Sequence, residues 1–299
     1  MDKPELTGAG SFFSGVLTYG RMIKFSHTVF ALPFALSAVI LVQREHAITF
    51  AQVFWILVAM VSARSAAMGF NRIVDADIDG DNPRTAGREI PAGRLSAASA
   101  IAFVTGSALL FVISAAMLGR LCFYWSVPVL AVLCGYSYTK RFTWLAHFVL
   151  GFAISLAPLG VWVALTDSYP GAIVLLSLAL LFYITGFDIL YACQDVDFDQ
   201  TRGLFSVPAR FGVRRALRLA AGIHALAFVC FLLIHPAFEM NRIYPVAVAL
   251  IGLLLIVEHR LVKPDDLRRV NLAFFHVNSL ISITLFAGVL ADEVARRWM

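Results

Sequence analysis

Charged side chains are scarce in this sequence. Only 14% of its 299 residues are Asp, Glu, Lys or Arg, whereas 60% are hydrophobic. An apolar fraction this high excludes a disordered chain, a coiled coil and an ordinary soluble domain. Cysteine is also rare, and Cys122, Cys134, Cys193 and Cys230 are isolated from one another, which excludes a secreted disulfide scaffold. The composition predicts a membrane protein that crosses the bilayer several times.

Long apolar runs are abundant, and nine of them are long enough to cross about 30 Å of hydrocarbon. They are residues 25–42, 50–70, 97–118, 121–139, 144–165, 170–192, 216–235, 243–262 and 272–291. Residues 1–20 lack a basic start, an apolar run and a small-residue cleavage site in that order, so no cleavable signal peptide is expected. The sequence predicts an all-α polytopic membrane protein with nine transmembrane helices, in which residues 1–299 form one domain.

The distribution of Lys and Arg predicts the orientation, because these residues prefer short loops on the cytoplasmic side. Most of them fall in loops on the same side as the N-terminus, so we expect the N-terminus inside and the C-terminus outside. Basic residues in these loops would face an anionic lipid leaflet, which accounts for the net charge of +5. No basic tract is interleaved with aromatic residues, so nucleic acid is not an expected partner.

Asn and Asp residues at every fourth position occupy the two longest loops, both on the predicted inner face. They form a first ladder of Asn71, Asp75 and Asp79 and a second ladder of Asp195 and Asp199. This spacing places each ladder along one face of a helix, where like charges repel. A bound cation would neutralise them, and Mg²⁺ is suited to carboxylates together with substrate phosphates. The alternative is that these acidic loops are simply solvated.

These motifs resemble those of the UbiA superfamily of intramembrane aromatic prenyltransferases. The resemblance rests on the two ladders together with Tyr136-x-x-x-Lys140 at the end of the fourth predicted span. Within the superfamily, residues 82–94 and 206–212 are most similar to bacterial 4-hydroxybenzoate polyprenyltransferases and related enzymes of quinone synthesis. One departure is Arg72, where the family often has Asp. The ladder positions themselves are intact.

The resemblance implies a helical bundle around a central cavity, with the two ladders facing each other beneath cytoplasmic segments. The first ladder would bind one Mg²⁺ and the second ladder another, while Tyr136 and Lys140 would bind the diphosphate of the substrate. Arg84 and Arg88 are further candidates for diphosphate binding, because guanidinium groups bind such oxygens well. Their alternative role is that of basic anchors on the inner face.

The implied reaction transfers a polyprenyl group from polyprenyl diphosphate to an aromatic acid, with loss of a ring proton. We expect 4-hydroxybenzoate as the acceptor, and a dihydroxynaphthoate of menaquinone synthesis is the alternative. The expected location is the bacterial inner membrane, with the active site facing the cytoplasm. A cation transporter is the rival from another class. Transporter sites usually lie near the bilayer midplane, whereas these ladders lie at the ends of their spans.

Two ionisable residues lie inside predicted spans, where each is costly unless it is paired or faces water. Arg64 lies seven residues before Asn71, and Asp188 lies seven residues before Asp195. Each is therefore about two helical turns deeper than its ladder and on nearly the same face. Arg64 is predicted either to bind the carboxylate of the acceptor or to form an ion pair with Asp188.

Overall fold

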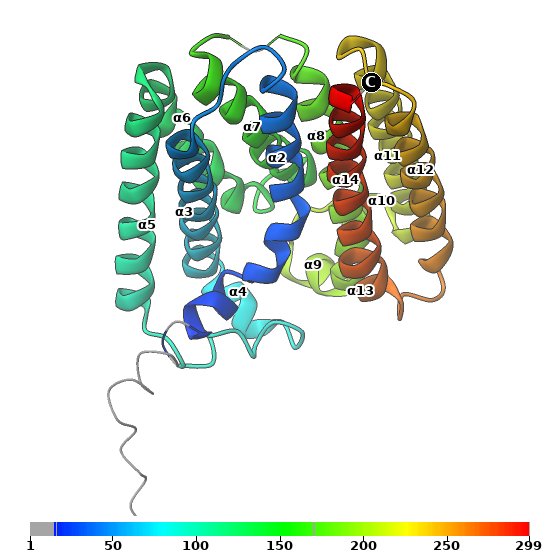
Figure 1. Cartoon of the computed structure of the whole chain (residues 1–299). Helices are drawn as coiled ribbons and strands as arrows, with labels where there is room; N and C mark the ends of the chain where they lie inside the picture. The colour runs from blue at the N-terminus through cyan, green and yellow to red at the C-terminus, as the bar shows by residue number, and fades with distance from the viewer. Residues whose placement is uncertain (1–14, 16, 170, 299) are drawn as a thin grey trace, which may run out of the picture.

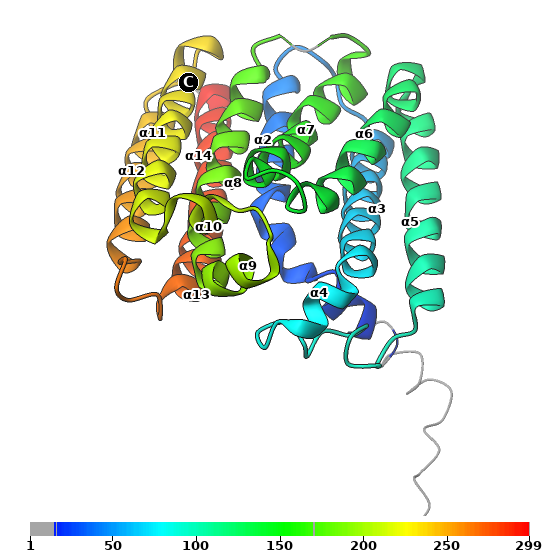
Figure 2. The same cartoon turned by 180° about the vertical axis from the view of Figure 1, so that it is seen from behind.

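The structure is a bundle of helices, shown in Figure 1 from one side and in Figure 2 from behind. It is a computed structural model that describes residues 15, 17–169 and 171–298. Within this part of the chain there is no strand, and only an isolated bridge joins Lys263 to Asp266. The predicted all-α fold class is confirmed for the described residues.

Eight helical segments of the described chain are long and apolar enough to cross a membrane. Their main helices are α3 (Phe50–Val74), α5 (Ala97–Leu118), α6 (Arg120–Thr139), α7 (Ala146–Thr166), α8 (Val174–Ala192), α11 (Val213–Ala237), α12 (Ile243–Leu261) and α14 (Asn278–Trp298). Shorter elements are η1 (Phe25–Phe30), α2 (Leu32–Val42), α4 (Ala76–Asp81), η2 (Cys193–Asp195), α9 (Val196–Arg202), α10 (Val207–Phe211), α13 (Val270–Leu272) and η3 (Ala273–Val277). The eight long segments overlap eight of the nine predicted spans, although the segments Val174–Arg202 and Val270–Trp298 extend well beyond the predicted ends at residues 192 and 291.

The predicted first span, residues 25–42, is divided into two elements. A 3₁₀-helix, η1, ends at Phe30, and α2 then begins with Pro33 in its first turn. Proline favours this position because it lacks the N–H that the first turn of a helix leaves unsatisfied. The 11 residues of α2 rise only about 16 Å, so α2 alone is shorter than the hydrocarbon core.

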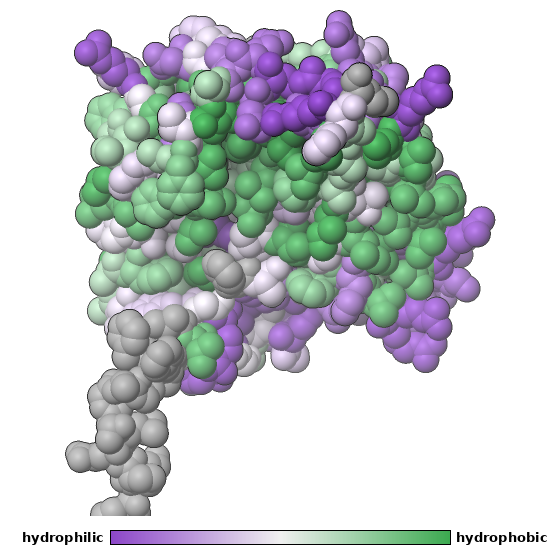
Figure 3. Space-filling model, in the orientation of Figure 1, coloured by the Kyte–Doolittle hydropathy of each residue, from purple (hydrophilic) through white to green (hydrophobic). Residues whose placement is uncertain are grey.

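An apolar belt surrounds the bundle, and polar side chains gather at its two ends (Figure 3). In each of α5 and α6, only 11% of the apolar 18-residue stretch is buried inside the protein. A helix that is apolar all round and exposed on most of its surface suits a lipid environment. The four cysteines are free, as predicted.

The helices form two groups that are joined through α2 and α7. Helices α3, α5 and α6 lie on one side, and α8, α11, α12 and α14 lie on the other (Figures 1 and 2). The short helices α4 and α9 lie at the end opposite the C-terminus, which we call the ladder end. The fold therefore brings both acidic ladders to the same end of the bundle.

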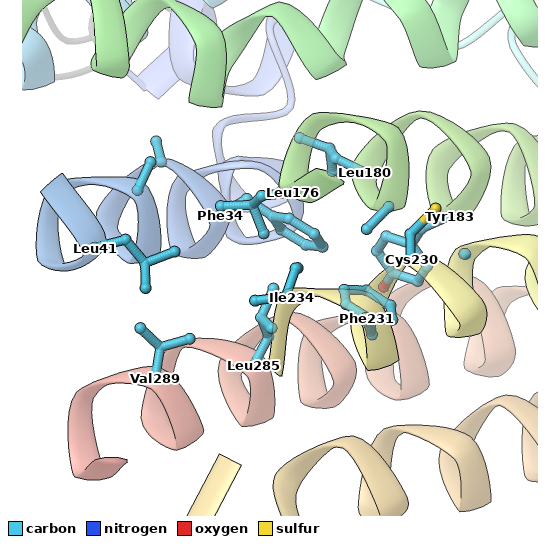
Figure 4. Packing of buried hydrophobic residues seen from close by; sticks show 14 of the residues in the cluster. Phe34, Leu41, Leu176, Leu180, Tyr183, Cys230, Phe231, Ile234, Leu285 and Val289 are labelled. Atoms are coloured by element: carbon cyan, nitrogen blue, oxygen red, sulfur yellow. The ribbon is translucent and has the colours of Figure 1, made fainter. Parts of the chain in front are cut away.

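The largest buried cluster fills the space between α2, α8, α11 and α14 (Figure 4). Phe34 stacks on Tyr183 at a ring-centroid distance of 5.8 Å and lies 6.0 Å from Phe231. Leu285 completes this layer from α14, and all four side chains are fully buried. Burying each such side chain contributes roughly 1.5–3 kcal/mol in water, although within a membrane close packing carries more of the association.

Glycine allows α8 and α11 to approach each other closely. A Cβ atom added to Gly186 would lie 2.1 Å from Cδ2 of His224. The His224 ring is itself held by Nε2, which lies 3.1 Å from the carbonyl oxygen of Tyr183. Since the ring is buried on all sides, it has no space into which it could move.

We therefore expect Gly186→Ala to destabilise the protein by about 1–3 kcal/mol through overpacking. Gly222→Ala is the matched control, because an added Cβ at Gly222 meets no atom within 4 Å. The control should stay within about 0.5 kcal/mol of wild type. Thermal unfolding of the two variants in detergent measures the difference, and equal midpoints would contradict this packing account.

Candidate active site

The first ladder crosses a break between two helices. Asn71 lies in the last turn of α3, Asp75 lies at the junction, and Asp79 belongs to α4. Backbone hydrogen bonds continue across the break, from Asp75 N to Asn71 O at 2.9 Å and from Asp79 N to Asp75 O at 2.7 Å. The three side chains therefore keep the helical spacing that the sequence predicts.

The second ladder has the same local geometry. Asp195 lies at the junction of η2 and α9 with φ −104° and ψ 8°, and Asp75 has φ −93° and ψ 7° at its own junction. Asp199 follows inside α9, as Asp79 does inside α4. Each ladder thus begins where one helix ends and a short helix turns across the ladder end.

Basic side chains neutralise the first ladder. Lys140 Nζ lies 2.8 Å from Oδ2 of Asp75, and Arg141 Nη2 lies 3.0 Å from Oδ1 of the same carboxylate. Asp79 forms an ion pair with Arg88. Both acids are buried, so these partners offset the cost of removing the carboxylates from water.

Two reciprocal ion pairs join the ladders. Arg84 follows α4 and binds Asp195 through Nε at 2.8 Å and through Nη2. In return, Nη2 of Arg202, at the end of α9, lies 2.5 Å from Oδ2 of Asp81, at the end of α4. Arg84 also donates to the hydroxyl of Tyr191 at 3.0 Å. These ion pairs therefore hold the two ladder segments together at the ladder end.

Asparagine and hydroxyl groups orient the remaining ladder oxygens. Asn71 Nδ2 donates to Oδ2 of Asp75 at 2.9 Å, while its carbonyl accepts from Arg72 Nη1 at 3.3 Å. Ser206 Oγ donates to Oδ2 of Asp199 at 2.7 Å. Arg72, which departs from the family pattern, also donates to the backbone carbonyl of Met22 at 3.2 Å and so ties the ladder to the chain before η1.

No three His, Cys, Asp or Glu side chains of the described residues come close enough together to hold a metal ion by themselves. The donor set nevertheless fits Mg²⁺, which takes one or two carboxylates and completes its shell with water and substrate phosphates. The ladders supply only oxygen atoms as potential ligands. Asp75, Asp79 and Asp195 already bind cationic side chains, whereas Asp199 accepts from the hydroxyl of Ser206.

A largely apolar cavity of about 480 Å³ lies among α3, α5, α6 and α7. Its lining includes Met60, Phe111 and Trp125, and its two most polar members are Arg64 and Tyr136. No ladder residue lines the cavity, but Tyr136 directly precedes Ser137, whose Oγ lies 3.4 Å from Nδ2 of Asn71. The cavity therefore lies in the apolar part of the bundle and approaches the first ladder through Tyr136.

The predicted ion pair between Arg64 and Asp188 is wrong. Arg64 Nη2 instead donates to the backbone carbonyls of Lys24 and Ile23, at 3.1 and 3.4 Å. Asp188 binds His147, whose Nδ1 lies 2.7 Å from Oδ2 of the carboxylate. The helix packing explains the error, because α7 packs against α8 and presents His147 to Asp188 as a closer partner.

Sequence reasoning missed three polar residues at the site. Arg141 adds a second cation on Asp75, and its only sequence signal is its position directly after Lys140. Lys24 is brought toward Arg72 by the fold, and no spacing in the sequence connects them. Burial, together with the positive charges of Arg72, Arg88 and Arg84, lowers the pKa of Lys24 to about 8. His147 is the third, and no spacing in the sequence connects it to its partner Asp188.

The helical bundle thus carries paired acidic ladders at one end and an apolar cavity among α3, α5, α6 and α7. The chain belongs to the UbiA prenyltransferase family, which it matches over residues 31–280. It is an aromatic prenyltransferase, and the transporter alternative is wrong.

Curated relatives and solved structures agree with this membership. The 4-hydroxybenzoate octaprenyltransferase of Nitrosomonas europaea is 30% identical over 248 residues, which cover 80% of this chain and 82% of that one. The enzyme of the same name from Aeromonas hydrophila is 27% identical over 236 residues, which cover 79% and 82%.

Among solved structures, the apo UbiA homolog from Aeropyrum pernix K1 superposes with a TM-score of 0.81 at 32% identity, covering 89% of this chain and 98% of that one. A UbiA homolog from Archaeoglobus fulgidus bound to GPP and Mg²⁺ superposes with a TM-score of 0.69 at 19% identity, covering 91% and 99%. This second likeness shows the fold alone.

The lowered pKa of Lys24 predicts proton uptake when an anion binds. Near pH 8.5 the free amine is partly deprotonated, and a nearby diphosphate would raise its pKa by favouring the charged form. We expect uptake of a fraction of a proton on binding of inorganic diphosphate with Mg²⁺ near pH 8.5, and less near pH 6.5. Calorimetry in buffers of different ionisation enthalpy measures it. Lys24→Met should abolish this pH-dependent uptake, and unchanged uptake in that variant would refute the role of Lys24.

Proposed function

We propose that this protein transfers a polyprenyl group from polyprenyl diphosphate to 4-hydroxybenzoate in an Mg²⁺-dependent reaction of quinone synthesis. The observation that carries the proposal is that two cation-paired acidic ladders lie at one end of a bundle whose apolar cavity is lined by Arg64 and Tyr136. The curated relatives named 4-hydroxybenzoate octaprenyltransferase support this acceptor over a dihydroxynaphthoate.

The ladder residues fit the metal role. Asn71, Asp75 and Asp79 would hold one Mg²⁺, and Asp195 and Asp199 would hold a second. The ions would supply positive charge to the diphosphate as its bond to the prenyl carbon breaks.

Basic residues of the chain would also supply positive charge to the diphosphate. Lys140, Arg84 and Arg88 now bind ladder carboxylates, and each can turn to a diphosphate oxygen when the ions neutralise those carboxylates. Such charge-assisted bonds are among the stronger hydrogen bonds in proteins.

Two further residues serve the substrates inside the cavity. Tyr136 can donate its hydroxyl to the diphosphate from the cavity wall. Arg64 has Nε buried without a hydrogen-bond partner, so it retains a donor for the carboxylate of the acceptor. The apolar lining accommodates the prenyl chain and excludes water from the reactive prenyl cation.

The membrane arrangement follows from the same proposal. Residues 1–299 form one domain in the bacterial inner membrane, with the N-terminus inside and the C-terminus outside. Together η1 and α2 rise about 28 Å, which supports a ninth crossing at residues 25–42. The basic residues at the ladder end then face the cytoplasm, and so does the active site.

The direct test is incubation of the purified protein with polyprenyl diphosphate, 4-hydroxybenzoate and Mg²⁺, followed by mass analysis of the product. We expect the prenylated acid, no product in EDTA, and recovery when Mg²⁺ is restored. Full turnover in metal-free buffer would eliminate the metal proposal. If product forms only from a dihydroxynaphthoate, that acid replaces 4-hydroxybenzoate as the acceptor.

A matched pair of variants tests the ladder. Asp79 is buried on the ladder face of α4, whereas Asp77, on the same helix, is exposed. We expect Asp79→Asn to lower kcat by at least about 10²-fold, as loss of one strong electrostatic group at a reacting centre does. Asp77→Asn removes the same charge and should retain activity. Equal losses in both variants would indicate a general charge effect.

The orientation predicts where reporters become accessible. A reporter fused after Met299 should lie outside the cytoplasm, and one inserted at Gly203, between α9 and α10, should lie inside. Alkaline phosphatase and green fluorescent protein fusions distinguish the two compartments. The opposite pattern would place the ladders on the outer face.

A further inference from the structure

His147 and Asp188 form a buried pair that the reaction described above does not use. His147 lies at the start of α7 and Asp188 lies four residues before the end of α8, with 2.7 Å between Nδ1 and Oδ2. His147 is buried, whereas the Asp188 side chain is 24% exposed. A carboxylate within a membrane-spanning helix that still reaches open space is a candidate functional group.

Close helix packing fixes the distance between the two side chains. One turn beyond His147, a Cβ added to Gly151 would lie 2.6 Å from the carbonyl oxygen of Leu181 and 2.3 Å from Oγ1 of Thr185. Thr185, one turn before Asp188, donates to the backbone carbonyl of His147 at 3.4 Å. The register of α7 against α8 is therefore set beside the pair.

A backbone amide fixes the tautomer of His147. The N–H of Val207, in the first turn of α10, donates to Nε2 at 3.3 Å. Because an amide can only donate, Nε2 carries the lone pair and Nδ1 carries the proton. The Nδ1 proton is then donated to Asp188, so the imidazole stabilises an ionised carboxylate and orients it.

The second oxygen of Asp188 remains available. Among the described residues, Oδ1 has no hydrogen-bond partner, whereas Oδ2 is occupied by His147. Asp188 lies two helical turns below Asp195, Arg64 lies two turns below Asn71, and Arg84 joins the two ladders by binding Asp195. Asp188 and Arg64 therefore lie at similar depths beneath the joined ladders, and Arg64 lines the cavity. An acceptor bound through Arg64 would lie beside Asp188.

We propose that Asp188 accepts the ring proton of the acceptor, with His147 as the positioning residue, an inference that rests on the proposed function. The prenyl C–O bond breaks and its electron pair leaves with the diphosphate. Ring π electrons form the new C–C bond. The C–H bond at the same ring carbon then breaks, its electron pair restores the aromatic ring, and the proton moves to Oδ1 of Asp188.

The ladder carboxylates are less suited to this step. Asp75, Asp79 and Asp195 are bound to cations, and Asp199 accepts from Ser206. Asp188 lies two turns deeper and is bound only to a neutral imidazole. The departing diphosphate is the competing proton acceptor, and the experiment distinguishes it from Asp188.

The test uses the purified full chain and compares 4-hydroxybenzoate with its ring-deuterated form. In wild type, proton loss follows C–C bond formation rapidly, so kcat should be the same for the ordinary and the deuterated substrate. Asp188→Asn should lower kcat by about 10²–10⁴-fold, as expected for loss of a general base. A normal primary isotope effect should appear in the variant, because proton loss becomes rate-limiting. Asp167→Asn, at the outer end of α7, is the control and should match wild type.

His147 is tested by rescue. His147→Gln can still donate to Asp188 and accept from Val207, so it should retain much more activity than His147→Leu. Arg64→Ala gives the contrasting result, a raised acceptor KM with no isotope effect. If Asp188→Asn does not fold, Asp188→Glu keeps the carboxylate but displaces it, and it should show the same isotope effect at reduced kcat.

The outcomes separate the two proposals. An unchanged kcat in Asp188→Asn, or a lowered kcat without an isotope effect, would overturn the role of Asp188 and leave a structural pair or the diphosphate as acceptor. Because the isotope ratio is measured within one preparation, partial loss of folded protein does not change it. Absence of product from wild type would overturn the proposed function, and this step with it.

Discussion

Charge compensation at one end of an apolar bundle is the constraint on which the site depends. A carboxylate within or beside hydrocarbon is costly unless a partner neutralises it, and this chain places four ladder carboxylates together at the ladder end. The cations come from separate segments, with Lys140 and Arg141 at the end of α6 and Arg84 and Arg88 in the loop after α4. Pairing thus draws together helix ends that apolar packing alone would leave unspecified.

Local features of the site could be predicted from the sequence, whereas its pairings could not. Asn71, Asp75 and Asp79 keep their predicted spacing because backbone hydrogen bonds continue through the helix break. The partner of Asp188 depends on the register between α7 and α8, which Gly151 helps to set. No periodicity in the sequence encodes that register. A hydropathy window likewise cannot detect the division of residues 25–42, since both pieces are apolar.

The two ladders have similar backbones but different partners. Asp75 and Asp195 occupy equivalent junctions with nearly equal torsion angles, which agrees with an origin of the two ends from one repeated unit. However, the first ladder is buried among ionic partners, whereas Asp199 accepts from a serine and Asp195 takes its cation from the first half of the chain. The charge balance is therefore shared between the halves.

The reciprocal pairs Arg84–Asp195 and Arg202–Asp81 also limit how this sequence can diverge. Each pair joins residues more than one hundred positions apart, and loss of one member leaves its partner uncompensated. Substitutions at these sites are tolerated most readily when both members change together. Correlated variation between the two acidic segments is therefore the expected evolutionary signature of this contact.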